Sequence, residues 1–173
     1  MGKLLFLATG LLFAKENNIG AFVQTPNTTI SQARQITFTG PRAGEGYFSR
    51  NGEWLIFQAE RHDGNPFYQM YLLNLKSGQT RRVSPGPGKT TCGWIHPDMK
   101  KVMWSSTHLD PDFDKKAVEE YNNRKQAVKT KYAWSYDEHF DIFESDLNGK
   151  KVRRLTNQLG YDAEGSYSPD GKY

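Results

Sequence analysis

Cysteine is nearly absent from this sequence, since Cys92 is the only one among 173 residues. A single thiol excludes an intrachain disulfide and a zinc site built on cysteines, so the fold must be stabilised by packing. Familiar catalytic motifs are absent as well: there is no Gly-x-Ser-x-Gly elbow, His-Glu-x-x-His helix, phosphate-binding loop or dinucleotide fingerprint. We therefore predict a protein without catalytic residues, metal or cofactor.

Apolar runs long enough to cross a membrane are also missing. The N-terminal run from Leu4 to Ala14 has eleven residues and lies between Lys3 and Lys15. A bilayer takes about 20 apolar residues, but this length fits the hydrophobic region of a secretory signal. We expect a signal peptide at 1–21, a linker at 22–33, no transmembrane segment and a periplasmic or otherwise exported protein. The alternative is a buried N-terminal strand or helix.

The charge is modest and local. The formal net charge is +4, and the segment from Lys115 to Lys131 carries six basic residues against two glutamates, so the rest of the chain is close to neutral. Nucleic-acid binding is not expected, because the basic residues gather in one segment without an aromatic stacking platform.

Two landmarks recur along the chain at the same pair of intervals. The first is an outer-strand pattern around Ile36, Val83 and Leu155, and the second is centred on the glycines Gly46, Gly93 and Gly165. In both cases the intervals are 47 and 72 residues. A period in the forties is typical of propeller blades, and the additional 25 residues indicate an insertion in the second repeat.

The repeats predict an all-β fold, a partial β-propeller of four-stranded antiparallel blades with one helical insertion. In the first unit, strands are expected at 45–49, 54–59, 68–75 and 80–84, separated by turns such as Asn51-Gly52. The predicted boundaries are 34–39 for an N-terminal strand that completes the last blade, 44–84 for blade 1, 90–156 for blade 2 with its insertion at about 109–136, and 162–173 for the start of blade 3.

The same residues resemble the repeats of TolB-like propellers. The similarity lies in the Glu164–Lys172 segment (EGSYSPDGK), in Arg153–Thr156 (RRLT) and in Arg61–Pro66 (RHDGNP), and the resemblance covers about Arg34 to Tyr173. It departs at Phe48–Gly52, which lacks the proline and aspartate of the turn, and at Met99, which replaces the turn glycine. The likeness implies an exported propeller of six or seven blades that is monomeric when complete.

Two functions follow from this resemblance, and both stay open at this point. Such propellers serve as non-catalytic protein-binding modules or adaptors, and they also serve as accessory or gating domains of longer exported serine or zinc peptidases. Because two full blades and a started third are expected here, the sequence is interpreted as a fragment that is marginally stable by itself. Its coding sequence beyond Tyr173 would separate the two functions.

The insertion is predicted to contain a helix that begins near an N-cap at Asp114. Val118, Tyr121, Lys125, Val128 and Tyr132 recur at three- and four-residue steps and indicate a modest apolar stripe. The helix is either a basic recognition element for an acidic protein partner or a solvated lid packed on its own blade, and the lid is favoured because charge runs usually mark solvated faces.

Loops between second and third strands should lie where the central channel opens, and such loops commonly form binding surfaces. Histidines and charged residues gather in them, although their spacing matches no metal motif. The candidate binding residues are Arg61, His62, Asp63, His108, Asp110, Arg124, Lys125, Asp137 and His139.

Overall fold

The computed structural model describes residues 22–23, 33–126 and 136–173. The signal peptide predicted at 1–21 and most of the predicted linker lie outside these residues. The chain divides into two compact units, Met1–Ile36 and Thr37–Tyr173. In the first unit, strands β1 (Phe22–Val23) and β2 (Ala33–Arg34) form an antiparallel pair.

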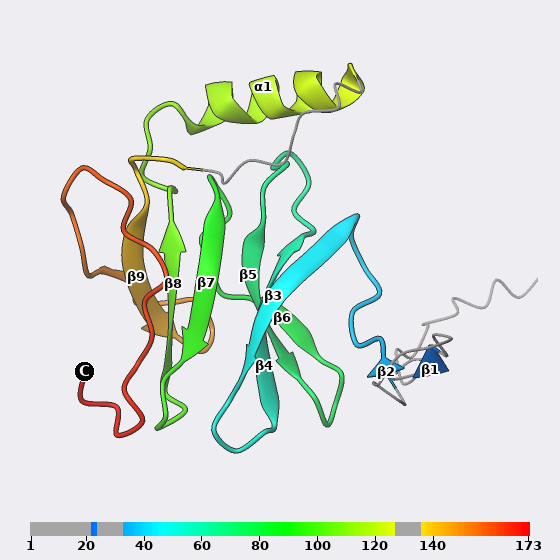
Figure 1. Cartoon of the computed structure of the whole chain (residues 1–173), viewed down its shortest axis with the longest axis vertical. Coiled ribbons are helices and arrows are strands. Elements are labelled where there is room, and N and C mark those ends of the chain that lie inside the picture. Colours follow the sequence, from blue (N-terminus) through cyan, green and yellow to red (C-terminus); the bar gives the residue numbers. More distant parts are fainter. Residues whose placement is uncertain (1–21, 24–32, 127–135) are drawn as a thin grey trace, which may run out of the picture. The chain divides into compact units, whose positions relative to one another are not determined.

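The second unit contains two antiparallel four-stranded sheets and one helix, which confirms the predicted fold class (Figure 1). Each sheet follows chain order, as a propeller blade does, and the two sheets do not close a ring. Blade 1 consists of β3 (Arg42–Phe48), β4 (Trp54–Glu60), β5 (Gln69–Asn74) and β6 (Thr80–Arg82). Blade 2 consists of β7 (Thr90–Ile95), β8 (Lys101–Ser106), β9 (Asp141–Asp146) and β10 (Arg153–Arg154).

The core lies between the two blades. Consecutive apolar residues of the middle strands are buried, so these strands are buried on both faces. Its fully buried members come from both sheets and include Ile56, Met70, Leu72, Val83, Val102, Trp104 and Phe143. Gly93 of β7 permits this close approach: a Cβ atom there would lie 2.5 Å from Met70 Sδ and 2.9 Å from Ile56 Cδ1. Gly165 occupies the equivalent place on blade 2, where a Cβ would lie 3.2 Å from Ile142 Cδ1 and 3.3 Å from Met103 Cε.

The backbone conformation repeats at the same intervals as the sequence. Glu45, Cys92 and Glu164 have φ angles of 23°, 53° and 61°, and each directly precedes one of the repeated glycines. Register shifts in β3 and β7 fall at these positions, so the unusual angles belong to a β-bulge in the inner strand. The two intervals of 47 and 72 residues therefore describe a repeated local structure and not only a repeated motif.

The turn after each inner strand is also repeated. The backbone N–H groups of Ser49, His96 and Ser168 donate to the carbonyl oxygens of Trp54, Lys101 and Tyr173 over 2.7 to 2.9 Å. The left-handed position of this turn is held by Gly52, Met99 and Gly171, with φ of 70°, 60° and 71°. Met99 thus adopts the conformation of the glycine that it replaces, at a cost of about 1 kcal/mol.

Two predicted strands are not formed. The strand expected at 34–39 is not present, since β2 ends at Arg34, and no strand is assigned after β10 within the described residues. A strand requires a hydrogen-bonded neighbouring strand, and neither 35–39 nor 162–173 is paired with one within the described residues. Residues 162–173 nevertheless contact blade 2 as β7 contacts blade 1: Asp162 N donates to Phe140 O, just as Thr90 N donates to Tyr68 O.

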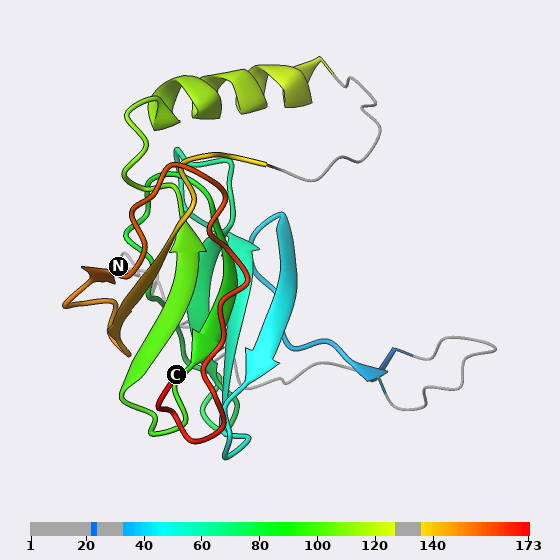
Figure 2. The same cartoon turned by 60° about the vertical axis from the view of Figure 1, so that its left-hand side comes forward.

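Helix α1 (Phe113–Lys125) lies across the same end of both sheets, as the two views in Figures 1 and 2 show. Its N-cap is Asp112 and not Asp114, and no side chain caps it. The predicted apolar stripe is wrong, because Ala117 is the buried residue of α1 and Val118 is 58% exposed. Val128 and Tyr132 lie outside the described residues. No helix in the described part of the chain is long and apolar enough to cross a membrane.

Candidate functional site

The connection between β4 and β5, the connection between β6 and β7, and helix α1 meet at one end of the blades (Figure 1). Asn65 organises the first two connections. Its Nδ2 donates to the carbonyl oxygens of Gly86 and Gly88 over 2.6 and 2.8 Å, and its Oδ1 accepts from Phe67 N over 2.9 Å. The Gly-Asn-Pro part of the sequence motif is therefore structural, since it fixes the loop that leads into blade 2.

Asp137 is the counterpart of Asn65 in blade 2, 72 residues further along the chain. Its Oδ1 accepts from His139 N over 3.2 Å, which repeats the Asn65–Phe67 contact. A carboxylate cannot donate to carbonyl oxygens, however, and Asp137 instead accepts from Lys89 Nζ at 3.0 Å and from Lys116 Nζ at 2.9 Å. Burial alone would raise the pKa of Asp137, but the hydrogen bonds from Lys116 and Lys89 outweigh it and lower the pKa to about 2.

Lys116 also neutralises a second buried carboxylate. Its Nζ lies 2.7 Å from Oδ2 of Asp110, whose side chain is 0% exposed. Burial would lower the pKa of Lys116, yet the hydrogen bonds to Asp110 and Asp137 outweigh it and raise the pKa above its ordinary value. One ammonium group of α1 therefore pairs with two carboxylates, which come from the two ends of the β8–β9 connection.

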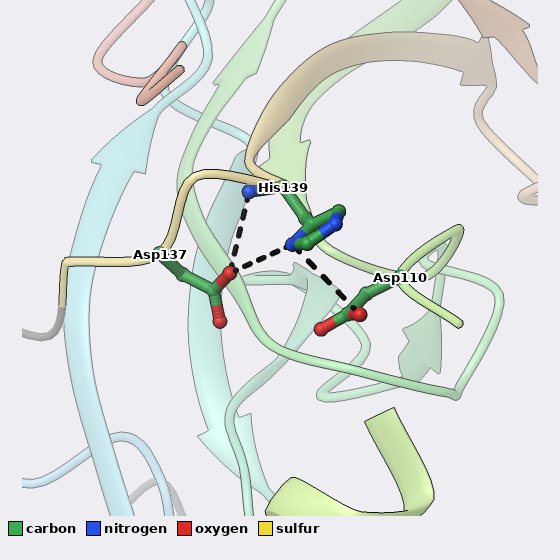
Figure 3. A group of neighbouring side chains, drawn as sticks. All are labelled: Asp110, Asp137 and His139. Carbon is green, nitrogen blue, oxygen red and sulfur yellow. Dashed lines mark hydrogen bonds and ion pairs between the residues drawn. The ribbon is translucent and has the colours of Figure 1, made fainter. Parts of the chain in front are cut away.

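His139 completes this group, as Figure 3 shows. Its Nδ1 lies 3.5 Å from Asp137 Oδ1 and 3.8 Å from Asp110 Oδ1, which is beyond hydrogen-bond length. The three side chains offer one ligand atom each within 4.8 Å of one another, a set that could hold a metal ion. The Lys116 ammonium lies within 3 Å of both carboxylates, so the protein supplies the positive charge for this set itself.

Arg124 attaches the other end of α1 to blade 1. Its NH1 lies 2.7 Å from Glu60 Oε1, its NH2 donates to Pro66 O over 2.6 Å, and its Nε donates to Glu120 Oε1 over 2.7 Å. Glu60 Oε2 in turn pairs with Arg42 of β3 at 2.7 Å. Helix α1 is thus tied to blade 2 through Lys116 and to blade 1 through Arg124, which corrects the prediction that it packs only on its own blade.

The structure brings some of the predicted residues together and leaves others apart. Asp110, Asp137 and His139 form one group, while Arg124 is occupied by internal ion pairs. His62, Asp63 and Lys125 are exposed at the same end. The Arg61 guanidinium lies over the rings of Phe57 and Tyr71, and the His108 ring lies 4.2 Å from that of Phe143.

Lys116 and Lys89 were not among the predicted site residues. The signal that could have found them is the internal repeat, because it aligns Asp137 with Asn65 and replaces an amide that donates hydrogen bonds by a carboxylate that needs donors.

Two side chains resemble reactive groups, but neither is accessible to a substrate. Ser106 Oγ lies 3.0 Å from His108 Nδ1, as in a nucleophile–base pair, yet Ser106 is 0% exposed. Cys92 is buried, and burial raises the pKa of its thiol, which disfavours the reactive thiolate. Ser106 and Cys92 are therefore packed side chains of the fold.

An open cleft of about 420 Å³ lies between α1 and the loops of both blades. It is lined by Phe67 and Lys89 from the blade connections, by Lys116, Glu119, Glu120 and Asn123 from α1, and by Tyr136, Asp137 and Glu138 from the segment that leads into β9.

Comparison with known proteins shows which known fold this chain resembles. No family model matches the chain. Among solved structures, TolB from Acinetobacter baumannii matches 82% of this chain at 24% identity with a TM-score of 0.51, and putative TolB from Agrobacterium tumefaciens matches 80% at 19% identity with a TM-score of 0.53. The fold is TolB-like.

This TolB-like chain spans only part of the structures that it matches, 28% of the Acinetobacter protein and 42% of the Agrobacterium protein. A structure from a study of two prolyl endopeptidases matches 76% of this chain and 17% of its own at 16% identity with a TM-score of 0.48, which is too weak a similarity to support an argument.

Proposed function

We propose that this chain is a non-catalytic, protein-binding propeller segment that contacts its partner through the α1 end of the blades. The observation that carries the proposal is the attachment of α1. Lys116 and Arg124 hold the helix across both blades, so its remaining surface faces solvent as a fixed platform beside an open cleft. Loops positioned by a rigid scaffold are the usual place for recognition.

Two further observations support a binding role. Ser106 and Cys92 are buried, so neither offers a nucleophile to a substrate. His62, Asp63 and Lys125 are exposed at the same end of the blades and are therefore available to a partner. The TolB-like fold is compatible with this role, although one fold hosts many functions and the surface has to carry the argument.

Export and the order of segments belong to the same proposal. Residues 1–21 have the pattern of a secretory signal. We propose that 34–39 pairs with a last blade and that 162–173 begins a third blade in the complete, monomeric propeller. Fractionation of cells that produce the full chain tests export: the processed protein is expected in the exported fraction, and retention of the unprocessed chain in the cytoplasm contradicts it.

Site-specific photo-crosslinking tests the binding surface. A photoreactive amino acid replaces Lys125 at the α1 end in one version of the chain and Lys76, in the β5–β6 turn at the opposite end, in another. We expect a discrete adduct from position 125 and none from position 76. The adduct is identified, and the purified partner is then tested for direct binding.

A matched pair of variants completes this test. The triple variant His62→Ser, Asp63→Ser, Lys125→Ser should weaken binding of that partner at least tenfold, whereas Lys76→Ser should leave it unchanged. Equal crosslinking from both positions, or equal affinity of both variants, would overturn the proposal.

A further inference from the structure

The cleft between α1 and the blades has more negative than positive charge. Four carboxylates line it, from Glu119, Glu120, Asp137 and Glu138, against the two ammonium groups of Lys89 and Lys116. Both ammonium groups are already bound to Asp137, at 3.0 and 2.9 Å. The positive charges of the cleft are therefore used internally and are not available to a ligand.

Two of the carboxylates are left over. Glu120 holds Arg124, and Asp137 holds the two lysines. Glu119 and Glu138 are exposed, and their carboxylates make no ion pair within the described part of the chain. They extend from α1 and from the β9 connection into the same cleft, so a cation placed there would meet carboxylates from both sides.

Aromatic rings accompany these carboxylates. Phe67 and Tyr136 line the cleft, and Tyr136 is 66% exposed while its ring stacks on Tyr161 at 5.6 Å. Phe67 already binds a cation, because Lys89 Nζ lies 5.4 Å from the centre of its ring. Aromatic faces together with carboxylates form the surroundings that a guanidinium group prefers, since it stacks and pairs at the same time.

We propose that this cleft binds an arginine side chain of the partner protein, with Glu119 and Glu138 as its counter-charges and Tyr136 as its stacking surface. The inference rests on the proposed protein-binding function and names the chemistry of the partner. It reverses the expectation of an acidic partner at the inserted helix. An acidic side chain in the cleft would have to displace Lys89 or Lys116 from Asp137, which leaves a buried carboxylate without its counter-charge.

The probe for this site is N-acetyl-arginine methylamide, titrated into the isotopically labelled full chain and followed by NMR. N-acetyl-citrulline methylamide is the matched control, because citrulline has the shape of arginine without its charge. We expect saturable shifts of the Phe67, Tyr136 and Glu138 amide signals with the arginine probe and none with citrulline. Equal shifts with both probes, binding of N-acetyl-glutamate methylamide at these residues, or shifts confined to other regions would overturn the inference.

Isosteric variants test whether Glu119 and Glu138 supply the negative charge that binds the arginine probe. The double variant Glu119→Gln, Glu138→Gln should weaken the arginine probe roughly 3- to 10-fold, the effect expected for two exposed ion pairs. Glu53→Gln, in the β3–β4 turn at the opposite end, should leave the affinity unchanged. Unchanged amide spectra away from the cleft show that the variants fold. Unaltered affinity of the double variant contradicts the assignment.

The outcomes separate this inference from the proposed function. If position 125 crosslinks to a partner but the arginine probe does not bind, the inference fails and the binding function stands. If the probe binds as described but no partner crosslinks from the α1 end, the cleft recognises a small cationic ligand and the protein-binding function fails.

Discussion

Replacement of Lys116 by methionine is the most informative perturbation of the α1 attachment. The change keeps the length of the side chain and removes the only ammonium group that pairs with Asp110 in the described part of the chain, together with one of the two that hold Asp137. Asp110 then loses its counter-charge and Asp137 keeps only Lys89, and a buried carboxylate without a partner is costly. We expect Lys116→Met to be clearly destabilising at neutral pH.

The magnitude follows from the pKa of Asp137. That pKa is about 2, against an ordinary value of 3.8, and each pKa unit corresponds to about 1.4 kcal/mol. Lys89 maintains part of this shift, and Lys116 is 32% exposed, so water weakens its ion pairs. Breaking a fully buried pair costs about 3 to 5 kcal/mol and an exposed pair at most about 1 kcal/mol, which places Lys116→Met at about 2 kcal/mol.

The pH dependence has a defined sign. Since the pKa of Asp137 is lowered in the folded chain, its ion pairs stabilise the fold above the ordinary pKa, and this contribution is lost as the pH falls from about 4 to about 2. We therefore compare the free energy of unfolding of the unmodified chain with that of Lys116→Met. The difference should have its full value at pH 6 and become smaller below pH 4.

Urea unfolding followed by circular dichroism at several pH values measures this difference. Lys115→Met is the control, because Lys115 is the exposed neighbour and its loss should change stability by less than about 0.5 kcal/mol. Adding Asp110→Asn to Lys116→Met should recover part of the loss. Equal effects of the two lysine variants, or a difference that grows in acid, would refute the reasoning.

Three further outcomes follow from the packing of the blades. Gly93→Ala should cost about 1 to 3 kcal/mol of unfolding free energy in the same urea assay, because its Cβ would lie 2.5 Å from Met70 Sδ; an unchanged midpoint contradicts this. Arg124→Ala should speed amide hydrogen exchange in the last turns of α1, where the contact with Glu60 is lost, and exchange as slow as in the unmodified chain would argue against that anchor. Cys92 should react with a thiol reagent only after unfolding, since it is buried and burial raises its pKa, and rapid reaction under native conditions would show otherwise.

The fold could be predicted from the sequence because the repeat intervals have a structural cause. Gly93 and Gly165 recur 72 residues apart since each lies where the next segment packs on the preceding blade. Local pattern also located most strands closely, as with the apolar run from Trp54, which forms β4 (Trp54–Glu60). The strands expected at 34–39 and in 162–173 do not form, because a strand depends on a partner as much as on its own residues.

The site was predicted less well, for a reason that lies in α1. Apolar spacing predicted that Val118 faces the blades, whereas Ala117 does. A shift of one residue rotates a helix by about 100°, and the observed orientation directs the neighbouring Lys116 to Asp110 and Asp137. Hydrophobic periodicity cannot predict the orientation of a helix that is held mainly by ion pairs, because such a helix needs no apolar stripe.

One substitution within the repeat connects the blades with the inserted helix. In blade 1 the amide of Asn65 satisfies loop carbonyls by donating to Gly86 and Gly88. Asp137 keeps the one interaction that a carboxylate can still make, acceptance from His139 N, and cannot make the others. A buried carboxylate also requires a counter-charge, and Lys116 of the insertion is one of the two lysines that donate to Asp137 within the described residues. The position that fixes a loop in blade 1 therefore fixes α1 in blade 2, and with α1 it fixes Glu119 and Glu120 at the wall of the cleft.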